Sequence, residues 1–129
     1  MTELGFAIAG FVDEGNEKAD RIERCLIDLE KKPGSKELVV EIFRAMHSFK
    51  GATSFLGFTE LCALAHAGES LLTRLRDGSL QMNPDVASAL LSLVDVMRDL
   101  LSEIAATGQE GSGDHSVLLK TLKQLETRH

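Results

Sequence analysis

Hydrophobic residues recur along this chain at steps of three and four positions, which is the spacing of one buried helix face. Five segments carry the pattern, at about residues 3–31, 35–56, 59–77, 84–107 and 114–127. The second segment shows it most clearly, in the apolar residues Leu38, Ile42, Ala45, Met46, Phe49, Ala52 and Leu56. The pattern predicts an all-α fold, an antiparallel four-helix bundle with an additional C-terminal fifth helix packed alongside.

Residues that favour helix ends separate these segments. Side chains suited to cap a helix N-terminus stand at four of the starts, at Ser35, Thr59, Asn83 and Asp114. Helix-stopping glycines follow the second and third segments, at Gly57 and Gly78. The glycine-rich stretch 108–113 predicts a flexible linker before the last helix. Glycines also lower the helix propensity of the first segment, so we expect an irregular start there, at Gly5, Gly10 and Gly15.

A polar site is expected on the outer side of the second segment. Ile42 and Phe49 mark the centre of the buried face, and His47 lies well round the helix from them, where solvent is expected. Lys50 lies on the same side as His47, and Gly51 lies one turn along. Glycine inside a helix costs roughly 1 kcal/mol relative to alanine, so we expect Gly51 to give a partner access to the imidazole.

The third segment carries polar residues in a matching position. His66 and Glu69 lie off the apolar face that its leucines form. The short connection 57–59 predicts an antiparallel helix hairpin, in which residues at equal distances from the turn lie at the same level. This geometry sets His47 opposite Glu69. It likewise sets Lys50 opposite His66, so four polar side chains are expected to meet between two helices.

These residues match a known signature. The run His47-Ser48-Phe49-Lys50-Gly51, followed by Gly57-Phe58 at the end of the helix, resembles the H-S-x-K-G signature of histidine phosphotransfer (HPt) domains. The sequence is most similar to the N-terminal phosphoacceptor domain of the chemotaxis histidine kinase CheA. His66 and Glu69 stand where that family carries its supporting histidine and glutamate. The resemblance covers essentially the whole chain, so residues 1–129 are interpreted as a single HPt domain with an HPt-like bundle.

The four polar side chains suit phosphoryl transfer through a histidine. A neutral imidazole is a competent nucleophile near pH 7, because its ordinary pKa is about 6.5. A carboxylate that accepts a hydrogen bond from one ring N–H fixes the tautomer and raises the basicity of the other nitrogen. Glu69 is placed to do this for His47, the residue expected to be phosphorylated. Lys50 would supply positive charge to the phosphoryl oxygens, and His66 would hold Lys50 or Glu69 in place.

The chain lacks the motifs that make a kinase. It has no glycine-rich phosphate loop and no Asp/Asn pair placed for magnesium and nucleotide. No cofactor is expected in this domain, and the resemblance implies that a separate ATP-binding kinase domain, in the same polypeptide or in trans, uses ATP and Mg. It also implies that His47 passes its phosphoryl group to the aspartate of a response regulator receiver domain. On this interpretation the chain is the phosphoacceptor part of a CheA-type kinase in a two-component, chemotaxis-type pathway.

Three other interpretations stay open. One is a free-standing phosphorelay protein, although the fifth helix and the Gly57-Phe58 pair favour the CheA type. A metal site made from His47, His66 and Glu69 is disfavoured, because Lys50 in its middle would repel a cation. A helical adaptor without chemistry would leave the meeting of four polar side chains unexplained.

Composition indicates the kind of domain and argues against a nucleic-acid partner and against insertion into a membrane. The chain of 129 residues is 43% apolar and 26% charged, which suits one globular helical domain. Its net charge is −6 and its Lys and Arg residues are scattered, so no nucleic-acid partner is expected. It has no run of 18 apolar residues and no evident signal peptide, so no membrane insertion is expected. Cys25 and Cys62 are isolated, which suits buried, reduced thiols in a cytoplasmic protein.

Overall fold

The computed structural model describes residues 2–128. This part of the chain consists of five helices joined by loops and contains no strand. In chain order the helices are α1 (Glu3–Lys31), α2 (Lys36–Leu56), α3 (Thr59–Asp77), α4 (Pro84–Thr107) and α5 (Ser116–Glu126). The all-α prediction is confirmed, and each predicted helix exists close to its expected bounds. None of the described helices is both long enough and apolar enough to cross a membrane.

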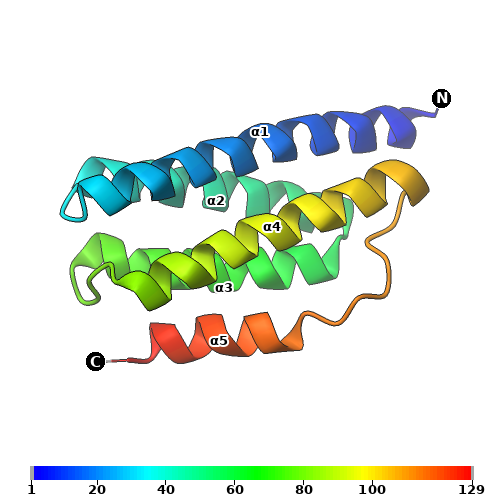
Figure 1. The fold of residues 1–129 in the computed structure, drawn as a ribbon. Helices are drawn as coiled ribbons and strands as arrows, with labels where there is room; N and C mark the ends of the chain where they lie inside the picture. The colour runs from blue at the N-terminus through cyan, green and yellow to red at the C-terminus, as the bar shows by residue number, and fades with distance from the viewer. Residues whose placement is uncertain (1, 129) are drawn as a thin grey trace.

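The first four helices form an antiparallel bundle, and α5 lies along its outside (Figure 1). Helix α2 packs between α1 and α3, and α4 closes the bundle against the same two helices. Helix α5 runs beside α3 and also contacts α4. Arg74 of α3 holds the C-terminal end of α5 against α3, because its guanidinium group donates hydrogen bonds to the carbonyl oxygens of Glu126 and Arg128. The expected fifth helix beside the bundle is therefore confirmed.

The core is built from the apolar helix faces that the periodicity predicted. Ile42 and Phe49, at the centre of the predicted face of α2, are almost completely buried. The ring of Phe11 stacks on Phe49 and on Phe58, with ring centroids 5.7 Å and 5.3 Å apart. These aromatic contacts tie the turn between α2 and α3 to α1. The position of α3 beside α2 is thereby set at the end where the hairpin turns.

Helix α1 is regular where an irregular start was expected. It is continuous from Glu3, and Oγ1 of Thr2 caps it by accepting a hydrogen bond from the backbone N–H of Gly5 at 3.0 Å. Gly15 is buried against α4, where an added Cβ would lie 2.9 Å from a methyl group of Leu101. The loss of helix propensity at Gly15 is offset by close packing between two helices.

Most helix ends follow the predicted signals. Oγ of Ser35 accepts a hydrogen bond from the backbone N–H of Leu38 at 3.3 Å. Oδ1 of Asn83 accepts one from the N–H of Val86 at 3.0 Å. Helices α2, α3 and α4 each end at a glycine with φ of 80°, at Gly57, Gly78 and Gly108. Side chains other than glycine rarely adopt this left-handed conformation, so these glycines set where the helices end.

The predicted cap at Thr59 is wrong. Thr59 is the first residue of α3, and the cap position belongs to Phe58, whose buried side chain makes no capping hydrogen bond. The carboxylate of Glu110 replaces the missing cap by accepting hydrogen bonds from the backbone N–H groups of Glu60 and Leu61, at 3.4 Å and 2.6 Å. The linker before α5 is thus attached to the start of α3.

Helix α5 begins two residues later than predicted. Oδ1 of Asp114 accepts a hydrogen bond from the backbone N–H of Ser116 at 2.9 Å, so Asp114 stays outside the helix in a local turn. His115 occupies the cap position and its side chain makes no capping hydrogen bond.

The two cysteines differ in burial. Both are free, with Cys25 buried and Cys62 half-buried, so the expectation of two buried thiols is met by Cys25 alone. Burial, together with the nearby charge of Glu41, raises the pKa of the Cys25 thiol to about 11. Cys25 is therefore protonated and unreactive at neutral pH.

Candidate functional site

His47 lies on the outer surface of α2. Its side chain is 62% exposed, whereas Met46 and Phe49 on either side are buried in the core. The hairpin brings Glu69 of α3 to the same level, and Nδ1 of His47 lies 3.1 Å from Oε1 of Glu69. The predicted placement of His47 opposite Glu69 is confirmed. The catalytic role of the pair stays a prediction.

The carboxylate of Glu69 also contacts Lys50. The side chain of Glu69 is 15% exposed, and Nζ of Lys50 lies 2.8 Å from its Oε2. This oxygen is shielded from solvent and has no aligned hydrogen-bond donor, so the contact with Lys50 is an ion pair. Partial burial by itself would raise the pKa of Glu69, but the interactions with Lys50 and then with His47 lower it overall. Glu69 is therefore a carboxylate at neutral pH.

The contact with Glu69 decides which ring nitrogen of His47 is free to react. An ionised carboxylate can only accept hydrogen bonds, so Nδ1 of His47 must carry the proton when the ring is neutral. The lone pair then resides on Nε2, the ring nitrogen that does not contact Glu69, in a side chain that is 62% exposed. The site consequently presents a nucleophilic nitrogen to solvent, with a negative charge behind the ring.

Two residues that the sequence analysis missed lie against this histidine. The ring of Phe43 stacks on the imidazole, with centroids 6.0 Å apart and planes inclined by 13°. The guanidinium carbon of Arg76, on α3, lies 4.2 Å from the centroid of the Phe43 ring. Phe43 precedes His47 by one helical turn, and this spacing was the available signal for the contact. Phe43 and Glu69 together restrict rotation of the imidazole.

The expected pairing of Lys50 with His66 is not made. His66 is exposed and forms neither a hydrogen bond nor an ion pair within residues 2–128. Lys50 instead forms an ion pair with Glu69. A long lysine side chain reaches past the residue opposite it, and a partly buried carboxylate gains more from a cation than an exposed imidazole does. Lys50 and His66 nevertheless share a shallow cleft of about 480 Å³ between α2 and α3. A supporting role for His66 stays a prediction.

Gly51 leaves the surface beside His47 open. It is exposed, and a Cβ added to it would have no atom within 4 Å. Gly68 of α3 contrasts with it, since a Cβ there would lie 2.5 Å from Cδ2 of Leu93. Packing therefore explains the glycine at position 68 and does not explain the one at position 51. This supports the prediction that Gly51 gives access to the imidazole.

The arrangement defines a class of protein. An exposed imidazole with a free Nε2, an ionised carboxylate behind it and an open surface beside it suits a helical-bundle phosphoacceptor reached by other proteins. In the part of the chain that the structure describes, no three His, Cys, Asp or Glu side chains are grouped so that they could hold a metal ion.

Comparison with known proteins gives the family. The model of the Hpt domain matches residues 7–107, which cover α2, α3 and α4 and most of α1. The chain therefore belongs to the Hpt domain family.

The relatives found by sequence are chemotaxis kinases. The chain is 32% identical to the sensor histidine kinase CheAY of Helicobacter pylori over 127 residues, which are 98% of this chain and 16% of that protein. It is 38% identical to the chemotaxis protein CheA of Halobacterium salinarum over 101 residues, which are 78% of this chain and 15% of that protein. The chain thus spans about one sixth of the length of these curated relatives.

The solved structures of similar fold are also domains of CheA proteins. The phosphorylated P1 domain of CheA3, solved in complex with CheY6 from R. sphaeroides, superposes with a TM-score of 0.88 at 29% identity. That comparison covers 95% of this chain and 96% of the other. The solution structure of the histidine phosphotransfer domain of CheA gives a TM-score of 0.86 at 30% identity, covering 96% of this chain and 92% of the other.

Proposed function

We propose that this chain is the phosphoacceptor domain of a CheA-type histidine kinase in a chemotaxis-type pathway. His47 accepts a phosphoryl group from an ATP-dependent kinase domain and passes it to the aspartate of a response regulator receiver domain. The observation that carries the proposal is the contact of 3.1 Å between Nδ1 of His47 and Oε1 of Glu69, which leaves Nε2 as the exposed nucleophile.

In the first step Nε2 of His47 attacks the γ-phosphorus of ATP. The Nε2–P bond forms as the bond from the γ-phosphorus to the oxygen of the β-phosphate breaks, and ADP leaves with that electron pair. The ring keeps its Nδ1 proton and gains positive charge as its Nε2 lone pair is used. The carboxylate of Glu69 stabilises this charge through the contact with Nδ1.

In the second step a carboxylate oxygen of the receiver aspartate attacks the same phosphorus. The Nε2–P bond breaks and its electron pair returns to Nε2, so the ring is again neutral and still protonated at Nδ1. Lys50 keeps Glu69 ionised throughout by its contact with Oε2. Glu69 therefore needs no proton of its own in either direction of transfer.

The partners of this chain follow from the same reasoning. ATP and Mg are bound by the separate kinase domain, and this domain holds no cofactor of its own. The relatives support these partners by name, since one is a sensor histidine kinase and another is a P1 domain in complex with CheY6. A pathway that uses ATP and receiver domains places the chain in the cytoplasm.

A labelling experiment tests the proposal. The chain is incubated with a CheA-type kinase core that lacks its own phosphoacceptor domain and with ATP labelled at the γ-phosphate. We expect acid-labile, alkali-stable label on the wild-type chain and none on His47→Gln, whose circular dichroism should be unchanged because the side chain is exposed. Label on the variant, or no label on either chain, contradicts the proposal.

A second phosphoryl donor, a receiver domain phosphorylated beforehand, distinguishes the free-standing alternative. A free-standing phosphorelay protein would gain label from a receiver domain phosphorylated beforehand, and it would gain none from a CheA-type kinase core. A purely structural adaptor would gain label from neither donor.

A further inference from the structure

Arg76 of α3 is a cation near His47 whose charge is not used within the site. Its side chain is 40% exposed, and its one ion-pair contact within residues 2–128 joins Nε to Oδ1 of Asp77 at 3.9 Å. Asp77 is the next residue in the chain and is itself 57% exposed. A long contact between two exposed groups contributes little to stability, so the guanidinium group of Arg76 is available to a new partner at low cost.

The ring of Phe43 keeps this guanidinium group near the imidazole. The guanidinium carbon of Arg76 lies 4.2 Å from the centroid of the Phe43 ring. The same ring stacks on the imidazole of His47, with centroids 6.0 Å apart and planes inclined by 13°. A cation over an aromatic face is held by the negative charge of that face, so the arginine side chain is restrained near the ring. One aromatic side chain therefore contacts both the cation and the nucleophile.

The other cation of the site, Lys50, is already neutralised. Its Nζ lies 2.8 Å from Oε2 of Glu69, and its side chain is 25% exposed. A neutral His47, a carboxylate at Glu69 and an ammonium group at Lys50 together carry no net charge. A phosphoryl group on Nε2 of His47 would add negative charge to a ring whose other nitrogen contacts a carboxylate. Like charges at this distance repel, so the phosphorylated site needs a further cation.

We infer that Arg76 binds the phosphoryl group of phosphorylated His47, to which its guanidinium group moves from the face of Phe43. The inference rests on the proposed function and adds a phosphoryl-binding residue to it. A guanidinium group presents its N–H donors in a planar fork that matches the oxygens of a phosphoryl group. These charge-assisted hydrogen bonds are stronger than a contact with an exposed aromatic ring, so the arginine moves when the phosphoryl group arrives. Arg76 forms no covalent bond and keeps its proton throughout.

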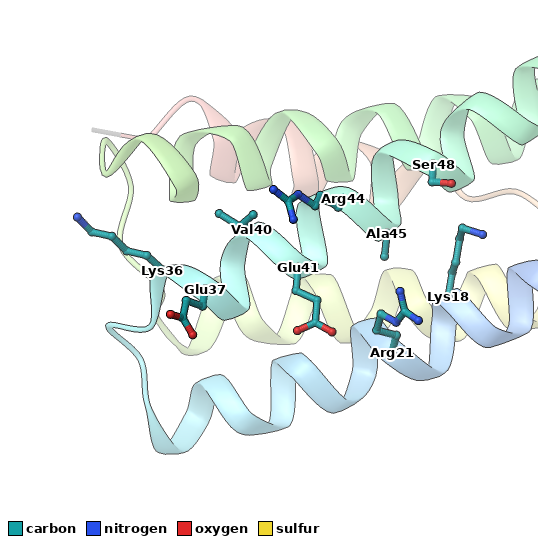
Figure 2. Close-up of a pocket in the computed structure, with 9 residues that line it drawn as sticks. All are labelled: Lys18, Arg21, Lys36, Glu37, Val40, Glu41, Arg44, Ala45 and Ser48. Carbon is teal, nitrogen blue, oxygen red and sulfur yellow. The ribbon is translucent and has the colours of Figure 1, made fainter.

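Labelling by a small donor tests the inference without any docking protein. The donor is phosphoramidate, and the variants are Arg76→Gln, Arg76→Lys and the matched control Arg44→Gln. Figure 2 shows Arg44 on α2, where it lines a groove of about 720 Å³ between α1 and α2. Arg44 is exposed and lies one turn before His47, and within residues 2–128 it stacks on no aromatic ring. Arg44→Gln therefore removes one positive charge near the histidine without removing the contact with Phe43.

The rates and the ionisation of the phosphoryl group should both respond to Arg76. We expect labelling of His47 to slow about three- to tenfold in Arg76→Gln, as for the loss of a charge-assisted hydrogen bond. Arg44→Gln should stay within about twofold of wild type, because an exposed charge without a contact contributes little. Arg76→Lys should lie between, since it keeps the charge and loses the fork. In a pH titration of the ³¹P signal, assigned by its absence in His47→Gln, the pKa of the phosphoryl group should be higher in Arg76→Gln than in wild type or Arg44→Gln, because a bound cation favours the more ionised form.

Three results would overturn the inference. The first is equal changes in Arg76→Gln and Arg44→Gln, because the effect would then be one of net charge. The second is an unchanged phosphoryl pKa in Arg76→Gln. If the ¹⁵N ring signals of unphosphorylated His47 also shift in that variant, Arg76 acts only by holding Phe43 in place. The third is a chain that gains no label at His47 from phosphoramidate or from the kinase core, which disproves the proposed function as well.

A fourth result separates the two proposals. A wild-type chain that gains label at His47 from phosphoramidate and none from the kinase core disproves the proposed function alone. The ³¹P titration then still decides whether Arg76 binds the phosphoryl group.

Discussion

Glu69 and His47 lie 22 positions apart in the chain, yet Oε1 of the one is 3.1 Å from Nδ1 of the other. The contact joins two helices, so the orientation of the imidazole depends on how α3 packs against α2. Glu69 is in turn held by Lys50, which belongs to the same helix as the histidine. The carboxylate therefore cannot turn away from the ring without losing an ion pair.

Replacing Glu69 by alanine should slow phosphorylation of His47 without abolishing it, because on the proposed function Glu69 orients the nucleophile and does not itself react. The loss of a hydrogen bond to a partly exposed group is worth about 1–2 kcal/mol, or roughly a factor of ten in rate. Lys50→Ala should have a smaller effect in the same direction. The measurements are the rate with phosphoramidate and the ¹⁵N ring signals of His47, which should show a lost preference for the Nδ1–H tautomer. An unchanged ring spectrum in Glu69→Ala would show that the contact does not orient the imidazole in solution.

The contribution of Glu69 to stability should depend on pH in acid. Its pKa is lower in the folded chain than its ordinary value of 4.5, so the folded state favours the carboxylate. The stabilisation is therefore fully present above pH 4.5 and is lost as the pH falls through the lower, folded value. Urea unfolding of wild type and Glu69→Gln at several pH values should show a stability difference above pH 5 that shrinks below pH 4. A difference that stays constant across this range contradicts the assignment of the lowered pKa to Glu69.

Phe43 should prove to be a positioning residue for His47. An aromatic pair of this kind is worth about 0.5–1.5 kcal/mol, so Phe43→Leu should slow reaction with phosphoramidate by about two- to tenfold. Phe43→Tyr keeps the stacked ring and should restore most of the rate. The ring signals of His47 should shift in the leucine variant and return toward wild type in the tyrosine variant. Equal rates for leucine and wild type would mean that the stack serves packing alone.

Replacing Gly51 by leucine should separate docking from chemistry. Leucine is the better helix former by most of about 1 kcal/mol, and the site around Gly51 is open, so the fold should be kept. The leucine side chain would stand on the surface beside His47 and obstruct another protein. The ratio of kinase-driven to phosphoramidate-driven labelling should therefore fall well below that of wild type. If the ratio stays the same, Gly51 is not an access residue.

Alanine at the two helix-interior glycines should have opposite effects on stability. Gly51→Ala adds a methyl group in open space and should raise the free energy of unfolding by about 0.5–1 kcal/mol. Gly68→Ala places Cβ 2.5 Å from Cδ2 of Leu93, a residue with no exposed surface, and should lower it by about 1–3 kcal/mol. Chemical denaturation of the two variants beside wild type gives both values. A stabilised Gly68→Ala would mean that Leu93 repacks freely.

The fold could be predicted from the sequence because the features that mark its helix faces and helix ends lie within short stretches of the chain. Helix faces follow from apolar spacing, and a glycine such as Gly57 marks an end whatever lies around it. The errors fall where a distant residue takes part. Thr59 is a good capping residue by type, yet the start of α3 is capped by Glu110, and no local pattern connects the two. Gly15 likewise lowers helix propensity, and its packing against Leu101 of α4 is invisible along the chain.

For the candidate site, the sequence predicted which residues of α2 and α3 lie opposite each other, but it did not predict which side chains make contact. The hairpin sets which residues stand opposite each other, and this sufficed for His47 and Glu69. It does not set where a long side chain points, so Lys50 was assigned to His66 although it pairs with Glu69. Phe43 was overlooked because a half-buried phenylalanine on a helix is usually part of the core.

Because α2 and α3 alone carry His47 and Glu69, substitutions that would displace these two side chains fall in a different part of the chain from substitutions that change only the neighbouring surface. The relative position of His47 and Glu69 is set within α2 and α3 and the turn between them, so substitutions on the outer side of α1 leave the reacting groups in place. Such substitutions nevertheless alter the surface that α1 shares with α2 beside the histidine. A lineage that duplicates this gene could thus give each copy a different partner while every copy kept the same reaction.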